Sequence, residues 1–163
     1  MSDATIDPGD FRRVLGHYPT GVTLITGHDD DGPVGAVMGS FGSVSLDPPL
    51  VMFLPTREST SWARIEATGS FCANVLGADD VDLCVAFFKK DPECWDRVPW
   101  HRSALGSPVF DHALAWIDCT VEDVLEAGDH LIVLGRVQHL DTTVEDGASP
   151  LVFFRGGYGR FED

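Results

Sequence analysis

Short apolar stretches separated by turn residues make up most of the chain. Residues 22–26 and 34–40 are rich in β-branched and apolar side chains and flank an acidic turn at 28–33, which predicts a β-hairpin. Apolar and polar residues alternate from Ala115 to Glu122, the period of a half-buried strand. Residues 130–137 are almost continuously apolar and predict a strand that is buried on both faces or lies inside a barrel.

Further short strands are predicted at 44–46, 50–54, 71–76 and 151–154. About seven or eight strands with two or three short helices favour a mainly β fold, an antiparallel β-barrel with peripheral short helices, over a doubly wound parallel sheet. No strand is followed by G-x-G-x-x-G, so the sequence does not support a Rossmann nucleotide site.

Capping residues and apolar spacing predict the helices. Asp7 as N-cap and Pro8 at the first position begin a helix whose apolar stripe is Phe11, Val14, Leu15 and Tyr18. A second helix begins after Ser59 or Thr60 and runs through Ile65, and a third covers 81–88 behind two aspartates. Residues 91–107 are predicted to be a long loop.

Composition indicates one compact domain over residues 1–163, with residues 1–9 as a flexible N-terminal tail. The net charge of −15 repels phosphate backbones, and no basic stripe interrupts it, so no nucleic-acid partner is predicted. No apolar run is long enough to cross a bilayer and the N-terminus is too acidic for a signal peptide, which predicts a cytoplasmic protein with no membrane partner. The cysteines and histidines do not fall at metal-ligand spacings, so no metal site is predicted.

The segment 35–49 is the most unusual part of the sequence because it combines three glycines with three serines. Its glycines allow close backbone approach to a ligand, and Ser40, Ser43 and Ser45 add hydroxyl donors. With one positive charge, such donors bind phosphate; Arg57, Ser59 and Thr60 follow the next strand and could close the same pocket. On residue types alone, a Gly/Ser-rich barrel turn explains the segment as well.

The chain resembles the flavin reductase-like family of flavin-binding split barrels, which includes the reductase components of two-component flavin monooxygenases. Blocks in the family's order span residues 11 to 159. They are Phe11-Arg12, Tyr18-Pro19-Thr20-Gly21-Val22, the run from Ser40 to Val51, Phe71 to Leu76, Gly128-Asp129-His130, Gly135-Arg136-Val137, Pro150-Leu151 and Gly157-Tyr158.

The resemblance implies an antiparallel split barrel that forms a homodimer and holds a flavin partly at the subunit interface. It implies that the isoalloxazine is lined by Pro19, Thr20, Gly21 and the strand with Val37, Met38 and Gly39 that leads into Ser40, Ser43, Val44 and Ser45. The serines, with Arg57, Ser59 and Thr60, would hold the phosphate. His130 would lie where nicotinamide stacks on the flavin, and Tyr158 would border the site.

The function implied is that of an NAD(P)H-dependent flavin reductase that supplies reduced FMN or FAD to a separate monooxygenase, with NADH or NADPH as hydride donor. Hydride transfer between two stacked rings needs no protein nucleophile, which agrees with the lack of a convincing catalytic triad. For His130 the expected role is a hydrogen bond or charge-orienting contact; otherwise it is a hairpin-turn residue capped by its aspartate neighbour.

Two positions depart from the family's commonest pattern. Where many members have a Thr and, two residues later, an Asn or Ser, this chain has Val37 and Gly39, and Gly42 follows the same trend. Backbone amides at glycine can replace the lost side-chain donors. Two alternatives therefore stay open: a flavin-retaining oxidoreductase acting on a small organic substrate, and a non-catalytic flavin- or ligand-binding barrel.

Overall fold

The computed structural model describes residues 5–143 and 148–162. The helices within these residues are α1 (Pro8–Leu15), α2 (Thr60–Thr68), α3 (Val81–Phe88) and the 3₁₀ turn η1 (Cys94–Arg97). The strands are β1 (Thr20–Gly21), β2 (Thr23–Asp29), β3 (Gly32–Met38), β4 (Gly42–Leu46), β5 (Pro49–Phe53), β6 (Ser70–Val75), β7 (Trp100–Arg102), β8 (Pro108–Phe110), β9 (Ala115–Ala127), β10 (His130–Thr142), β11 (Leu151–Phe154) and β12 (Gly157–Arg160).

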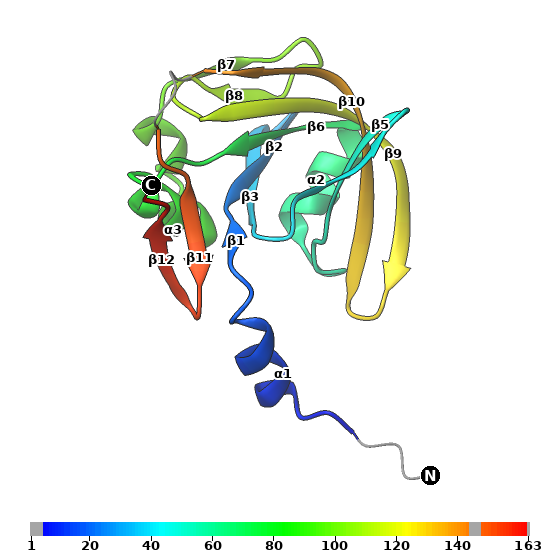
Figure 1. Cartoon of the computed structure of the whole chain (residues 1–163). Coiled ribbons are helices and arrows are strands. Elements are labelled where there is room, and N and C mark those ends of the chain that lie inside the picture. The colour runs from blue at the N-terminus through cyan, green and yellow to red at the C-terminus, as the bar shows by residue number, and fades with distance from the viewer. Residues whose placement is uncertain (1–4, 144–147, 163) are drawn as a thin grey trace.

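Seven strands form one antiparallel sheet in the order β3-β2-β6-β9-β10-β5-β4. The long β9–β10 hairpin and the β2–β3 hairpin lie on opposite sides of the curled sheet, and α2 lies in the space between them (Figure 1). A smaller sheet, β1-β11-β12, lies beside the barrel, and β7 pairs with β8. The predicted mainly β split barrel is confirmed.

Side chains of β2 point alternately to two cores, as the period of a strand requires. Ile25 belongs to the core around α2, where Trp62 and Ile65 pack against Phe53. Gly27 permits this approach, because a Cβ at its position would lie 3.1 Å from an Ile65 side-chain carbon. Burying α2 in this way places its N-terminus at one end of the barrel, beside β5 and β10.

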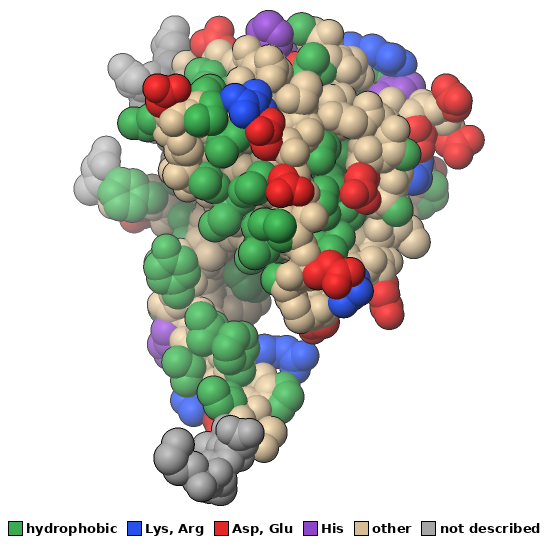
Figure 2. Space-filling model, turned by 90° about the vertical axis from the view of Figure 1, so that its right-hand side faces the viewer, with side chains coloured by type: hydrophobic (Ala, Val, Ile, Leu, Met, Phe, Trp, Pro, Cys, Tyr) green, Lys and Arg blue, Asp and Glu red, His purple; other side chains and the backbone are tan. Residues whose placement is uncertain are grey.

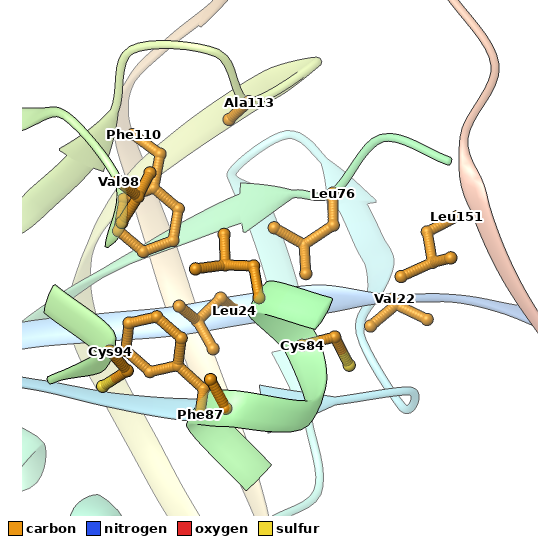
Figure 3. Close-up of a cluster of buried hydrophobic side chains, with 12 residues drawn as sticks. Val22, Leu24, Leu76, Cys84, Phe87, Cys94, Val98, Phe110, Ala113 and Leu151 are labelled. Atoms are coloured by element: carbon orange, nitrogen blue, oxygen red, sulfur yellow. The ribbon is translucent and has the colours of Figure 1, made fainter. Parts of the chain in front are cut away.

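The other face of β2 packs against α3. Leu24 lies with Cys84 and Phe87 of that helix, and Phe110 of β8 packs into the same cluster (Figure 3). A glycine again allows the contact, since a Cβ at Gly35 of β3 would lie 3.1 Å from the Phe87 ring. The last turn of α3 is thereby fixed against β3.

The sequence located most elements correctly. The β2–β3 hairpin is confirmed, the strand predicted at 151–154 coincides with β11, and α2 has Ser59 as its N-cap. The prediction of a long loop over 91–107 was wrong, because η1 and β7 lie within it. Both are too short to show a periodicity. Pairing with β8 holds β7, and the Ser103 hydroxyl that follows it donates to the buried Asp118 (2.8 Å).

Helix α1 begins as predicted, with the Asp7 carboxylate accepting hydrogen bonds from the N–H groups of Gly9 and Asp10. Pro8 and Gly9, which the sequence analysis assigned to the tail, therefore form its first turn. The helix projects below the body of the molecule, and apolar side chains gather on it (Figures 1 and 2). It buries none of its residues within the described chain, and its apolar stripe is exposed.

No helix in the described ranges, 5–143 and 148–162, is long and apolar enough to cross a membrane.

Asn74 of β6 joins the barrel to the β7–β8 segment through a buried polar network. Its amide nitrogen donates to the carbonyls of Leu24 and Pro108 (3.3 and 3.2 Å) and to the Thr26 hydroxyl (3.2 Å). Its carbonyl oxygen accepts from the N–H of Phe110 at 2.8 Å. The side chain is fully buried, so water cannot replace these partners.

We expect Asn74→Ala to lower the free energy of unfolding by about 1–3 kcal/mol, because it leaves buried backbone groups without partners. Urea denaturation followed by tryptophan fluorescence measures the change. Gln138→Ala is the control, because Gln138 makes an exposed side-chain hydrogen bond to Thr120 and should change stability by less than about 0.5 kcal/mol. Equal effects of the two substitutions on the free energy of unfolding would show that the buried network of Asn74 does not stabilise the fold.

Candidate functional site

A cavity of about 390 Å³ opens where the ends of five segments meet. These are the end of β3, the chain that follows β5, the N-terminus of α2, the last turn of α3 and the start of β10. The lining residues are Ala36, Val37, Met38, Gly39, Ser40, Leu54, Pro55, Thr56, Ser59, Ser61, Phe87, Phe88, Lys90 and His130.

Backbone hydrogen bonds hold the start of β10 against the linker between β5 and α2. The N–H of Leu131 donates to the carbonyl of Pro55 at 2.9 Å, and the N–H of Arg57 donates to that of Asp129 at 3.1 Å. Thr56 and His130 form an isolated antiparallel bridge between these two bonds. His130 is therefore fixed beside the N-terminus of α2.

Two serines of the cavity use their oxygens to organise the backbone. Ser40 Oγ accepts the N–H of Leu54 at 2.9 Å, and Ser59 Oγ accepts the N–H of Trp62 at 3.1 Å as the N-cap of α2. A hydroxyl that accepts in this way still has its own proton to donate. Both serines can therefore offer a donor to a ligand without giving up their structural role.

His130 is oriented by its neighbour in the turn. Its Nδ1 lies 2.7 Å from Asp129 Oδ1, and this hydrogen bond lowers the pKa of the Asp129 carboxyl. The carboxylate fixes the ring through Nδ1, so Nε2 is the nitrogen with which His130 can contact a ligand.

A second cavity, of about 720 Å³, adjoins the first and shares Ser40, Leu54 and His130 with it. Its remaining lining residues are Ile6, Pro8, Phe11, Arg12 and Asp129. His130 thus lies at the boundary between the first cavity, at the end of the barrel, and a larger one lined by α1. Both volumes fall in the range of small-molecule sites.

The first cavity differs from the rest of the molecule in its charge. The whole chain has 26 acidic and 11 basic residues, yet no aspartate or glutamate lines this cavity among the residues that the structure describes. Its only lysine or arginine is Lys90, and hydroxyls of Ser40, Thr56, Ser59 and Ser61 surround the space. Such a lining can accept an anionic ligand.

Thr20 has a buried hydroxyl without a hydrogen-bond partner in the described part of the chain. It lies directly behind the cavity wall, because a Cβ on Gly39 would lie 3.1 Å from Thr20 Oγ1. Glycine at this position therefore leaves room for the threonine hydroxyl. A buried hydroxyl without a partner is costly to the fold.

Several of the residues predicted from the sequence meet in the first cavity, and one more joins it indirectly. The lining includes Val37, Met38, Gly39, Ser40, Ser59 and His130. Thr60 lies next to it, because its hydroxyl accepts a hydrogen bond from the Lys90 ammonium group at 2.8 Å.

Other predicted residues lie elsewhere. Ser43, Val44 and Ser45 belong to the edge strand β4 and line neither cavity, and Gly21 pairs with Val152 in the small sheet. The Arg57 guanidinium forms an ion pair with Glu126 (2.9 Å) outside the lining.

Pro19 and Tyr158 line a separate, largely apolar cavity of about 400 Å³. The Cys84 thiol donates to the Tyr158 hydroxyl at 3.3 Å, and this bond, with partial burial, raises the pKa of Tyr158 to about 12.

Sequence reasoning missed the contribution of α3, and in the segment after β5 it named Arg57 but not the lining residues Leu54, Pro55 and Thr56. Phe87 and Phe88 end α3 and Lys90 follows its C-cap, and the sequence analysis predicted the helix at 81–88 without linking it to a site. Gly35 was a usable signal, because a glycine inside a strand indicates close approach of another element. The sequence could not show that this element is α3.

Comparison with known proteins identifies the chain at the level of its family. The model of the "Flavin reductase like domain" matches residues 15–162. A flavin reductase of Pseudomonas putida is 50% identical over 159 residues, which cover 97% of this chain and 92% of that protein. The reductase subunit HsaB of a flavin-dependent monooxygenase from Mycobacterium tuberculosis is 46% identical and is matched over 98% of this chain and 85% of its own length.

A solved structure with the same fold is the NADH:FAD oxidoreductase SgcE6 of Streptomyces globisporus in complex with NAD and FAD fragments. It superposes with a TM-score of 0.88 at 32% identity, covering 97% of this chain and 96% of the other. With a family model that spans nearly the whole barrel and relatives of up to 50% identity among those described, this chain belongs to the flavin reductase-like family.

Proposed function

We propose that the protein is an NAD(P)H-dependent flavin reductase that supplies reduced FMN or FAD to a separate monooxygenase. The observation that carries the proposal is a cavity free of described carboxylates, lined by hydroxyls and one lysine and bordered by His130, in a member of the flavin reductase-like family. Relatives named as flavin reductase and as monooxygenase reductase subunit support the reaction and the partner class.

The residues of the site fit a flavin. Val37, Met38 and Gly39 offer an apolar wall for the isoalloxazine ring. The backbone N–H at Gly39 can supply a donor that the family's commoner side chains at positions 37 and 39 would otherwise provide. Ser59 and Ser61 provide donors for the phosphate end.

The chemistry that a bound flavin supplies is acceptance of a hydride from reduced nicotinamide. The chain's own task is to hold the two rings in contact and to exclude water. His130 Nε2 is available at the boundary of the two cavities, so in this proposal the larger cavity beneath α1 receives the nicotinamide and His130 contacts both ligands.

The proposal includes a homodimer. Phe11, Val14 and Leu15 of α1 are each more than half exposed. An isolated helix of eight residues is only marginally stable in water, so α1 needs a surface on which to bury this stripe. A second copy of the chain supplies one, and α1 then encloses the cavity that it already lines through Phe11.

We expect the purified protein to oxidise NADH or NADPH only when FMN or FAD is added, because flavin is the hydride acceptor. Absorbance at the nicotinamide band measures the rate for each of the four pairs, and gel filtration with added flavin measures retention. Absence of flavin-dependent oxidation with all four pairs would favour the non-catalytic barrel. Tight retention of flavin would favour an oxidoreductase that acts directly on an organic substrate.

We expect His130→Ala to lower kcat/KM for the reduced nicotinamide by about 10- to 100-fold, because it removes an orienting contact made at the reacting rings. Steady-state kinetics at saturating flavin measure the loss. His139→Ala is the matched control, since His139 lies on the same strand but lines neither cavity. If His130→Ala kept the wild-type kcat/KM, His130 would have only a structural role in the turn.

We expect the wild type to be a dimer and Phe11→Asp/Leu15→Asp to be a monomer, because two carboxylates in the apolar stripe oppose its burial. Light scattering after gel filtration gives the mass of each. Leu140→Asp is the control, because Leu140 is 64% exposed and lies ten residues along β10 from the cavity. A monomeric wild type, or a double variant that stays dimeric, would show that α1 does not form a dimer interface.

A further inference from the structure

Lys90 occupies a backbone conformation that lysine seldom adopts. It directly follows the C-cap of α3 and has φ = +55°, one of two positive-φ residues other than glycine in the described chain. Glycine or asparagine normally fills this position after a helix, because a Cβ in the left-handed region costs about 1–2 kcal/mol. A lysine placed there in spite of this cost points to a use for its side chain.

The lysine side chain reaches the polar end of the first cavity. Its ammonium group donates to Thr60 Oγ1 at 2.8 Å, at the start of α2, and Ser59 and Ser61 line the same end. The ammonium group has two further protons for a ligand. Two lining hydroxyls at the start of α2 and one cation just after the end of α3 thus share this cavity, and the Thr60 hydroxyl links the two segments.

The charge of Lys90 is not neutralised within the described chain. No salt bridge there involves Lys90, and the adjacent Asp91 carboxylate pairs instead with Arg97 at 2.6 Å. No carboxylate lines the cavity either, so the positive charge stays available in a molecule whose net charge is −15. Arg57, the cation that the sequence suggested, is paired with Glu126.

We propose that Lys90 is the residue that recognises the terminal phosphate of the flavin, and that it thereby distinguishes the phosphorylated flavins from riboflavin. The proposal rests on the proposed function, because it assigns the ligand of the same cavity. In it the phosphate lies between the Lys90 ammonium group and the hydroxyls of Ser59 and Ser61, and the ring system extends toward Met38 and His130. The phosphate then replaces solvent as the counter-charge of Lys90.

The test compares FMN with riboflavin, which differs only in lacking the phosphate. Titration of the full-length protein, followed by quenching of flavin fluorescence, should give at least tenfold tighter binding of FMN by the wild type. Lys90→Met removes the charge at nearly constant length, and we expect it to weaken FMN binding by about 10- to 100-fold while riboflavin changes less than twofold. Lys90→Arg should restore most of the preference.

Lys90→Gly tests whether a loss of FMN affinity comes from a less stable fold. Glycine is favoured at a positive φ, so this variant should unfold at the wild-type temperature or above it while losing the same FMN affinity. A merely structural role for the lysine would not separate stability from phosphate affinity in this way. Lys89→Met is the matched control, because Lys89 is exposed, precedes Lys90 directly and does not line the cavity.

Several outcomes would overturn the proposal while leaving flavin binding intact. The wild type could bind FMN and riboflavin equally, or the Lys90 variants could keep the FMN preference. The Lys90 variants could also lose riboflavin binding as strongly as FMN binding, or Arg57→Met could lose the preference in their place. A wild type that binds neither flavin would overturn the proposed function, and the role of Lys90 with it. That failure is visible before any residue is changed.

Discussion

Packing of α2 inside the curled sheet is the constraint on which the site depends. Trp62 and Ile65 fill the barrel against Phe53, and Gly27 lets the helix come close to β2. The helix cannot slide along its axis without leaving voids or clashes, so its N-terminus stays at one end of the barrel. Backbone bonds from the linker to β10 then carry His130 to the same end. The position of the cavity is therefore a consequence of how the apolar core is filled.

The sequence predicted those parts of the fold that depend on local chemistry. Caps set the start of α2 and its end at Gly69, whose positive φ suits glycine, and alternation located β9. The Gly/Ser segment was correctly singled out, but the structure divides it. Ser40 turns into the cavity, whereas Ser43 and Ser45 run along the edge of the sheet. Whether a serine of this segment faces the cavity or the sheet edge depends on where β4 begins and on its register with β5. Residue types alone do not specify either.

Parts of the site that combine distant segments could not be read from residue types. Lys90 reaches the cavity because Gly35 admits Phe87, a contact between β3 and α3 across some fifty residues of chain. Some residues that carried the family resemblance stabilise the fold and do not line the site. Asn74 ties the barrel to the β7–β8 segment, and a Cβ on Gly135 would lie 2.3 Å from a Phe71 ring carbon.

The solitary cation has a consequence for exchange of the bound molecule with solvent. If the phosphate of a flavin binds where we propose, one exposed lysine and neutral hydroxyls hold it on a molecule whose overall field repels anions, which favours a short residence time. Added salt would then screen that repulsion and speed capture, the reverse of its effect on electrostatically steered partners. Brief occupancy is what a diffusing carrier requires, since whatever is reduced here must depart before a second protein can use it.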